Sequence, residues 1–301
     1  MPAHSRIALW VCSLTLVVSY LLPMPRPTRS SASSLLRVQG QRENLLHPKS
    51  RLAAGVGIMG IGIFSLMRAV SASPSLSPDP VHIADKIPAL YNSYATTYNI
   101  LDGGQPAEVL GINKMRAKAG EVARGDVLEV AVGTGLELDY LNLKTSSGSS
   151  KIKSLVGIDI STGMLSEAEK RLRAVSDASL MKVVPTRLLP MDASAMEFPD
   201  NTFDTVQSTF SFCVFEEPEK VLREMMRVVK PGGQVLLLEN SVSTFKPLAV
   251  LQDLTEPVIT PLSKNCRWNV DVPKMAEKVG LELQSGEAIQ AGTVYYGVYS
   301  K

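Results

Sequence analysis

The feature that most constrains this chain is an apolar stretch that runs directly into a glycine turn. Val127–Val132 is apolar apart from Glu129, and Gly133 and Gly135 follow it closely. A short apolar run rich in β-branched residues favours a buried strand. Glycines let the backbone turn sharply and approach a ligand with no side chain in between. The sequence therefore predicts a strand ending in a ligand-binding turn, with a helix N-terminus beyond it near Leu136.

A second strand-like stretch, Leu155–Ile158, ends in an acid. Asp159 lies 24 residues beyond Gly135, where an acid at a strand tip can accept hydrogen bonds from the ribose hydroxyls of a nucleoside cofactor. Two features argue against a dinucleotide: Glu129 lies inside the first strand, and the turn lacks a third glycine for a pyrophosphate. A cofactor with a positively charged amino-acid group and no phosphates tolerates an acid there.

From Ala84 onward, helical patterns alternate with short apolar segments, which indicates a doubly wound parallel α/β sheet with helices on both faces. The expected strands are Val127–Val132, Leu155–Ile158, Thr205–Thr209, Gln234–Glu239, Leu281–Ile289 and Thr293–Ser300. The expected helices are Lys86–Tyr98, Ala107–Arg124, Met164–Val175, Pro218–Val229 and Val272–Val279.

Further motifs follow in a set order: Pro190-Met191-Asp192-Ala193, the turn-rich Phe198–Val206, and Val229-Lys230-Pro231-Gly232-Gly233. Together with the first two strands, this set resembles class I S-adenosylmethionine-dependent methyltransferases over about Ala84 to Lys301. The resemblance implies a seven-stranded, mostly parallel sheet. One departure is Ala131, where that family usually has the first glycine of its turn.

The resemblance also implies S-adenosyl-L-methionine as the cofactor and assigns roles to individual residues. The implied cofactor-binding residues are Glu129, Gly133, Gly135, Asp159, Ile160, Asp192 and Ala193. The candidates facing the acceptor are Tyr91, Tyr94, Ser208 and Phe210. Tyr91, Tyr94 and Tyr98 share one helical face, so they either cover the cofactor or form a packed aromatic stripe.

The C-terminal part is similar to membrane-anchored methyltransferase-like proteins, a group that includes animal thiol S-methyltransferases and a fungal mitochondrial inner-membrane protein. The similarity follows Leu238-Glu239-Asn240, the amphipathic Leu248–Leu262, Asn265–Asn269 and the ending Tyr295–Lys301. The chain's three histidines (His4, His47, His82) all precede this part. A hydroxyl acceptor usually needs such a base, whereas a thiol ionises with little help.

We therefore expect an enzyme that methylates a small lipophilic acceptor at a membrane, with a thiol favoured and no metal required. A quinone-ring C-methyltransferase is the alternative. A non-catalytic assembly factor with this fold is the third interpretation, which the intact Asp159 and Asp192 argue against. No basic aromatic stripe marks a nucleic-acid surface, and a partner protein stays open. Cys213 and Cys266 lie far apart in the chain, so no disulfide framework or zinc site is indicated.

The N-terminal part has a different composition. Residues 1–78 contain eight Lys or Arg and a single acid, Glu43. Ile7–Leu22 is typical of a signal-peptide core, and the Ser- and Arg-rich residues 23–51 are typical of a transit peptide. This order predicts a plastid address, with the mitochondrial inner membrane as the alternative. Leu52–Met67 is a second uncharged apolar run, either a retained membrane anchor or a cleaved signal.

The expected organisation is a targeting leader over residues 1–51, an apolar membrane segment over 52–70, a linker over 71–83 and a methyltransferase domain over 84–301.

Overall fold

The computed structural model describes residues 86–99, 107–108, 110–141, 143–145, 150–177 and 182–301. The expected leader, the expected membrane segment over 52–70 and the whole expected linker over 71–83 lie outside these residues. None of the helices within the described ranges is long and apolar enough to cross a membrane.

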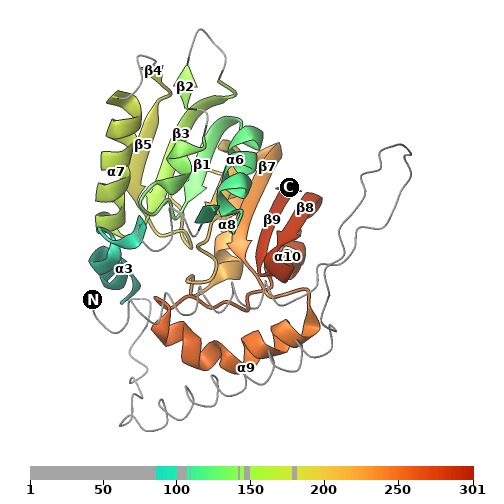
Figure 1. Cartoon of the computed structure of the whole chain (residues 1–301). Helices are drawn as coiled ribbons and strands as arrows, with labels where there is room; N and C mark the ends of the chain where they lie inside the picture. Colours follow the sequence, from blue (N-terminus) through green and yellow to red (C-terminus); the bar gives the residue numbers. More distant parts are fainter. Residues whose placement is uncertain (1–85, 100–106, 109, 142, 146–149, 178–181) are drawn as a thin grey trace, which may run out of the picture. The chain divides into compact units, whose positions relative to one another are not determined.

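A seven-stranded sheet forms the centre of the described domain (Figure 1). Its strands are β1 (Gly125–Val130), β3 (Ile152–Asp159), β5 (Thr186–Pro190), β6 (Phe203–Thr209), β7 (Val229–Asn240), β8 (Glu282–Ile289) and β9 (Val294–Ser300). They lie in the order β5-β3-β1-β6-β7-β9-β8. The first five run parallel, and β9 is antiparallel to both of its neighbours. The prediction of a mostly parallel, doubly wound sheet is confirmed.

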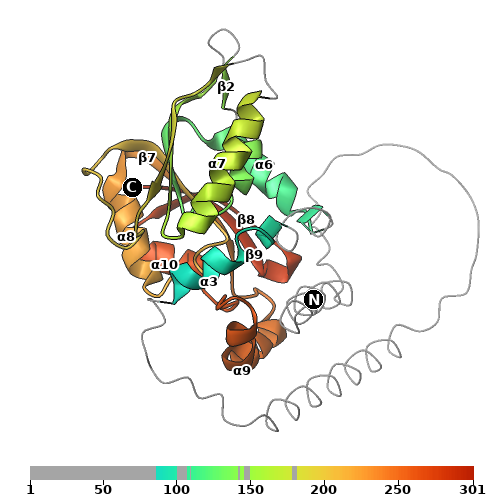
Figure 2. The same cartoon turned by 90° about the vertical axis from the view of Figure 1, so that its left-hand side faces the viewer.

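Helices cover both faces of this sheet (Figures 1 and 2). They are α3 (Ile87–Tyr94), α6 (Ile112–Val122), α7 (Thr162–Asp177), α8 (Pro218–Val228), α9 (Lys246–Leu262) and α10 (Val272–Lys278), with short 3₁₀ turns η2 (Leu136–Asp139) and η3 (Gln290–Gly292). A two-stranded ladder joins β2 (Lys144–Thr145) to β4 (Lys182–Val183).

Strand alternation divides the core between the two faces. On β1, Leu128 and Val130 pack in the cluster that includes α8 and α10, whereas Val127 packs with residues of α6 and α7. Successive side chains of a strand point to opposite faces, so one strand supplies both layers. The amphipathic α8 buries Leu222 and Met225 at helical spacing. Burial of each such side chain contributes roughly 1.5–3 kcal/mol.

The strand order reverses between β1 and β6. After β1 the chain adds β3 and β5 on one side, and it then returns to the other side of β1 to add β6 and β7. In doubly wound sheets, such a reversal opens a crevice at the carboxyl ends of the strands. The fold therefore places the turn after β1 and the acid at the end of β3 at one rim.

Three local expectations differ from the structure. The strand β5 was not anticipated, because its apolar content is only Leu188 and Leu189 between polar and proline residues. The helix expected after the glycine turn is only the 3₁₀ turn η2. The expectation that these cysteines form no disulfide was also wrong: Cys213 and Cys266 are bonded, 53 residues apart in sequence. The turn after α9 returns the chain to the loop after β6, which sequence spacing does not show.

Candidate functional site

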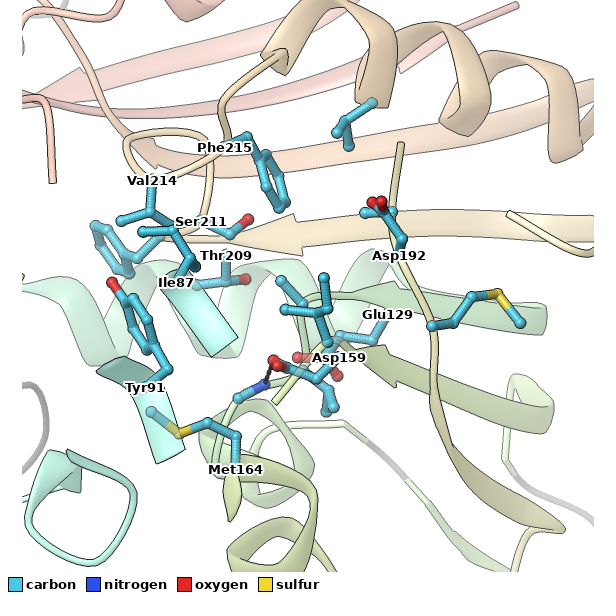
Figure 3. A pocket seen from close by; sticks show the side chains of 18 of the residues that line it. Ile87, Tyr91, Glu129, Asp159, Met164, Asp192, Thr209, Ser211, Val214 and Phe215 are labelled. Atoms are coloured by element: carbon cyan, nitrogen blue, oxygen red, sulfur yellow. Dashed lines mark hydrogen bonds between the residues drawn. The ribbon is translucent and has the colours of Figure 1, made fainter. Parts of the chain in front are cut away.

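A cavity opens at the carboxyl ends of the parallel strands (Figure 3). It is lined by the turn after β1, the end of β3, the segment after β5 and the loop after β6, with α3 and α6 contributing from outside the sheet. Most of its lining is apolar, and a few acids converge on it. Apolar clefts with few, placed polar groups are the usual form of small-molecule sites.

The turn after β1 holds three residues in the left-handed backbone region. Gly133 and Gly135 have φ values of 55° and 76°, and Ala131 has 55°. Alanine in this conformation costs roughly 1–2 kcal/mol, so the departure from glycine at 131 leaves the turn strained. Gly133 lines the cavity, whereas Gly135 does not. A Cβ at Gly135 would lie 2.7 Å from Leu138, so this glycine allows η2 to pack closely.

Asp159 ends β3 at the centre of the cavity. One carboxylate oxygen accepts a hydrogen bond from the Gly133 N–H at 2.9 Å, and the other accepts from the Ser161 N–H at 2.8 Å. Burial raises the pKa of Asp159, and these two bonds oppose the rise. Each carboxylate oxygen has two lone pairs. Two acceptor positions therefore remain for the ribose hydroxyls of a nucleoside.

Glu129 lies one strand away and is buried from bulk water. Burial raises its pKa to about 8, against the opposing effects of Arg116 and Gln207. Its Oε2 atom has no hydrogen-bond partner, and the residue lines the cavity. A buried carboxylate oxygen without a donor is costly. The ammonium of a methionine moiety would supply that donor, so this residue set fits an amino-acid-bearing cofactor.

The opposite end of the cavity suits a flat ring. Ile160 is 45% exposed although it is a large apolar residue, and it lines the cavity beside Asp192 and Ala193. Asp192 accepts a hydrogen bond from the Ser194 N–H at 2.7 Å. An apolar surface beside a carboxylate is what an adenine ring with its exocyclic amine would contact.

The loop after β6 forms the other wall. Figure 3 shows Thr209, Ser211 and Val214 together on one side of the cavity, away from Met164. Phe210 also lines the cavity, with a φ of 52°. A positive φ is unusual for a bulky residue.

The α3 helix closes this wall. The Tyr91 hydroxyl donates to the Lys264 carbonyl oxygen at 3.3 Å, and the Lys264 ammonium lies 4.5 Å from the Tyr98 ring centre. The Asn92 side-chain oxygen accepts from the Ser161 hydroxyl and the Gly163 N–H, both at 2.7 Å. These contacts attach α3 both to the end of β3 and to the segment after α9.

Two predicted acceptor-facing residues do not line the cavity. Tyr94 lies outside it, and its ring contacts the Lys264 ammonium at 5.7 Å. Ser208 is buried in the sheet, where it bonds to Glu239 instead. The reason is a long-range contact: the hydroxyl of Ser208 bonds to Glu239 on β7, so the cavity wall begins only at Thr209, the last residue of β6.

Two charged features of this site were not predicted from the sequence. Arg116 and Glu137 form a buried ion pair at the cavity wall, and the Arg116 guanidinium lies 5.4 Å from the Phe210 ring centre. Nothing in the spacing of these residues indicates the pair. Glu239 is wholly buried at the end of β7; an acid ending an apolar strand was the available signal.

Comparison with known proteins finds a family model that part of the chain matches. Residues 128–237 match the family model for a methyltransferase domain. The sheet order described above is that of the class I methyltransferase fold. This fold and the family model imply S-adenosyl-L-methionine as the methyl donor. That donor supplies a methyl group bonded to a positively charged sulfur, and the residues that would hold it are Asp159 at the ribose and Glu129 at the amino-acid end.

Two relatives of known type are similar to about half of this chain. The chain is similar to a phosphatidylethanolamine N-methyltransferase from Cereibacter sphaeroides, with 38% identity over 49% of this chain and 64% of that protein. It is also similar to the ubiquinone/menaquinone biosynthesis C-methyltransferase UbiE from Cronobacter sakazakii, with 33% identity over 55% of this chain and 63% of that protein. The chain thus spans just under two thirds of the length of these relatives.

A solved structure shows the same fold. It is the putative methyltransferase bound to the Trm112 methyltransferase activator of Haloferax volcanii, with a TM-score of 0.52 and 16% identity. The match covers 70% of this chain and 96% of that one. At this identity, the likeness is evidence of fold alone, and chemistry has to come from the site.

Proposed function

We propose that this protein transfers a methyl group from S-adenosylmethionine to a small lipophilic acceptor, with a thiol as the first candidate. The observation that carries the proposal is the acceptor wall. Its side chains include Tyr91, Phe210, Val214 and Phe215, which favour an apolar molecule. A soft, easily ionised nucleophile suits this wall, because the histidines of the chain all precede residue 86.

Methyl transfer of this kind gains mostly from alignment. Holding nucleophile and methyl carbon in line can contribute roughly 7–11 kcal/mol. The residues that would align an acceptor come from three separate segments: Tyr91 on α3, Phe210 after β6 and Arg116 on α6. Exclusion of water by the same apolar side chains would strengthen the effect of the buried acids.

A quinone-ring carbon is the second candidate. It is favoured by the similarity to a quinone biosynthesis C-methyltransferase, and a planar ring would fit against the aromatic wall. The relative named for phosphatidylethanolamine adds a lipid amine as a third class to test.

The test is a panel of acceptors incubated with the full-length protein and S-adenosylmethionine labelled in its methyl group. The panel contains 1-octanethiol and thiophenol, a demethylated quinol, and phosphatidylethanolamine in detergent. We expect label in the thiols, at a rate that rises with pH as thiolate forms, and no effect of a chelator. Transfer to the quinol with none to the thiols would replace the first candidate by the second.

We further propose that the protein acts at a plastid membrane, with the mitochondrial inner membrane as the alternative. This proposal is supported by the sequence of residues 1–80 alone, in which a signal-like core precedes a transit-like tract and an apolar run. A lipophilic acceptor is consistent with such a location, since it would concentrate in the bilayer.

A further inference from the structure

Behind the acceptor wall, a chain of hydroxyl groups leads from the cavity into the core. Ser211 lines the cavity, and its Oγ lies 2.5 Å from the Oγ of Ser208. The Ser208 hydroxyl in turn donates to Oε1 of Glu239 at 2.8 Å. The three residues belong to the loop after β6, to β6 itself and to the end of β7. Two short hydrogen bonds therefore connect the cavity to a carboxylate that has no exposure to solvent.

The two oxygens of Glu239 have different surroundings. Oε2 accepts from the N–H groups of Ser211 at 2.8 Å and Phe212 at 3.1 Å. Oε1 receives hydroxyl groups only, from Ser208 and, at 3.4 Å, from Ser211. A backbone N–H can only donate, whereas a hydroxyl can turn to accept. A proton arriving at Glu239 would therefore be held on Oε1, and the loop would stay attached through Oε2.

The charge environment suits proton uptake. Burial raises the pKa of Glu239 to about 7, against the lowering effect of its hydrogen bonds. The ionisable groups on the surrounding elements are Tyr295, in register on β9, Arg116 on α6, which is paired with Glu137, and Arg267, which bonds to backbone carbonyls of the loop. None of these three groups contributes to the shift. A group with a pKa near the working pH is the most effective proton acceptor.

An acceptor in this cavity has a proton to lose. A neutral thiol enters an apolar site more readily than its thiolate does, since burying the charge is costly. Glu129 and Asp159 are committed to the cofactor side of the cavity, one strand and two strands from β6. Ser211 is a hydroxyl on the acceptor side that is bonded onward to a buried carboxylate.

We propose that Ser211, Ser208 and Glu239 form a relay that accepts the proton of the acceptor during methyl transfer. The inference rests on the proposed function and adds a proton path to it. The acceptor's lone pair forms a bond to the methyl carbon while the methyl–sulfur bond breaks, and that electron pair stays on the sulfur. The acceptor's proton passes to Ser211 Oγ, the Ser211 proton passes to Ser208, and the Ser208 proton passes to Glu239 Oε1. Glu239 returns the proton to solvent after the product leaves.

The decisive comparison uses two thiols of different acidity. Ser211→Ala removes the hydroxyl and keeps the N–H that anchors the loop, and Glu239→Gln removes the proton acceptor. We expect both full-length variants to lower kcat for 1-octanethiol by about 100-fold. With thiophenol, which is more acidic and already ionised at the assay pH, the loss should be about threefold or less. Binding of S-adenosylmethionine should stay within about twofold of wild type.

Ser241→Ala is the matched control, because Ser241 is a buried serine near the end of β7 whose hydroxyl bonds to the Val270 carbonyl, away from the cavity. It should retain wild-type kcat with both thiols. An equal loss on both thiols in Ser211→Ala would show that the hydroxyl only shapes the wall, and no loss on either would exclude the relay.

Infrared spectroscopy tests the relay even if no thiol is turned over. The difference spectrum between wild type and Glu239→Gln should contain a protonated-carboxyl band that disappears as the pH rises through about 7. A band that is absent at every pH between about 5 and 9 would overturn the relay. Lack of turnover with both thiols in wild type would instead defeat the thiol assignment of the proposed function.

Discussion

Replacing both Cys213 and Cys266 by serine should destabilise the domain strongly, because the disulfide between them closes a loop of 53 residues. Closing a loop of this length removes chain entropy from the unfolded state that corresponds to about 4 kcal/mol at 25 °C. For a domain of this size, each kcal/mol changes the unfolding midpoint by roughly 2–4 °C. The expected drop is therefore about 8–16 °C. The same bond connects the loop after β6 to the turn after α9, so both walls around the acceptor should loosen as well.

The assay is thermal unfolding of the full-length protein with and without dithiothreitol, compared with the Cys213→Ser/Cys266→Ser double variant. Reductant should lower the midpoint of the wild type to that of the double variant, and it should leave the variant unchanged. If reductant has no effect on the wild type and free-thiol titration finds both cysteines reactive after unfolding, the two sulfurs are not bonded and the loop-closure reasoning fails.

Four further predictions concern the turn, the buried acid (two of them) and the leader. Ala131→Gly should raise the unfolding midpoint by a few degrees. The change removes roughly 1–2 kcal/mol of left-handed backbone strain from the folded state, which outweighs the loss of about 0.4–1 kcal/mol of stability caused by the greater entropy of glycine in the unfolded chain. A lower midpoint contradicts this. Burial raises the pKa of Glu129 to about 8, so binding of S-adenosylmethionine at pH 7 should release a proton from this carboxyl. Calorimetry in buffers of different ionisation enthalpy would detect the release, and Glu129→Gln should abolish it. Because that raised pKa favours the folded state only while the carboxyl keeps its proton, stability should fall as the pH rises from about 4.5 to about 8, and the Gln variant should lack this fall. A fluorescent fusion of residues 1–80 should enter plastids and resist carbonate extraction, and a uniformly cytosolic signal would refute both proposed locations.

The sequence predicted the site best where an apolar strand pattern stands directly beside residues with a chemical role. The strand before the glycine turn and the acid ending the next strand are local patterns, and the structure brings Glu129, Gly133 and Asp159 to one cavity. Their separation in sequence is bridged by parallel pairing of β1 and β3, which places both carboxyl ends at the same rim. Position in a doubly wound sheet thus follows from element order alone.

What the sequence could not show depends on long-range contacts. Ser208 was expected to face the acceptor, yet the carboxylate of Glu239, 31 residues later, holds it inside the sheet. The Cys213–Cys266 bond depends on where α9 ends, and the Arg116–Glu137 pair joins a residue of α6 to a residue of η2. Each of these contacts joins side chains that are brought together by packing between elements, and local periodicity in the sequence does not show such contacts.

The most direct test of the cofactor site is calorimetric titration of S-adenosylmethionine into the full-length protein and its Asp159→Ala variant. We expect saturable binding at one site in the wild type. The variant should lose two charge-assisted hydrogen bonds to the ribose, together worth about 3–6 kcal/mol, and its affinity should fall by about 100-fold or more. An affinity within about twofold of wild type would contradict the placement of the cofactor at the end of β3, and with it the assignment of this cavity as the methyl-transfer site.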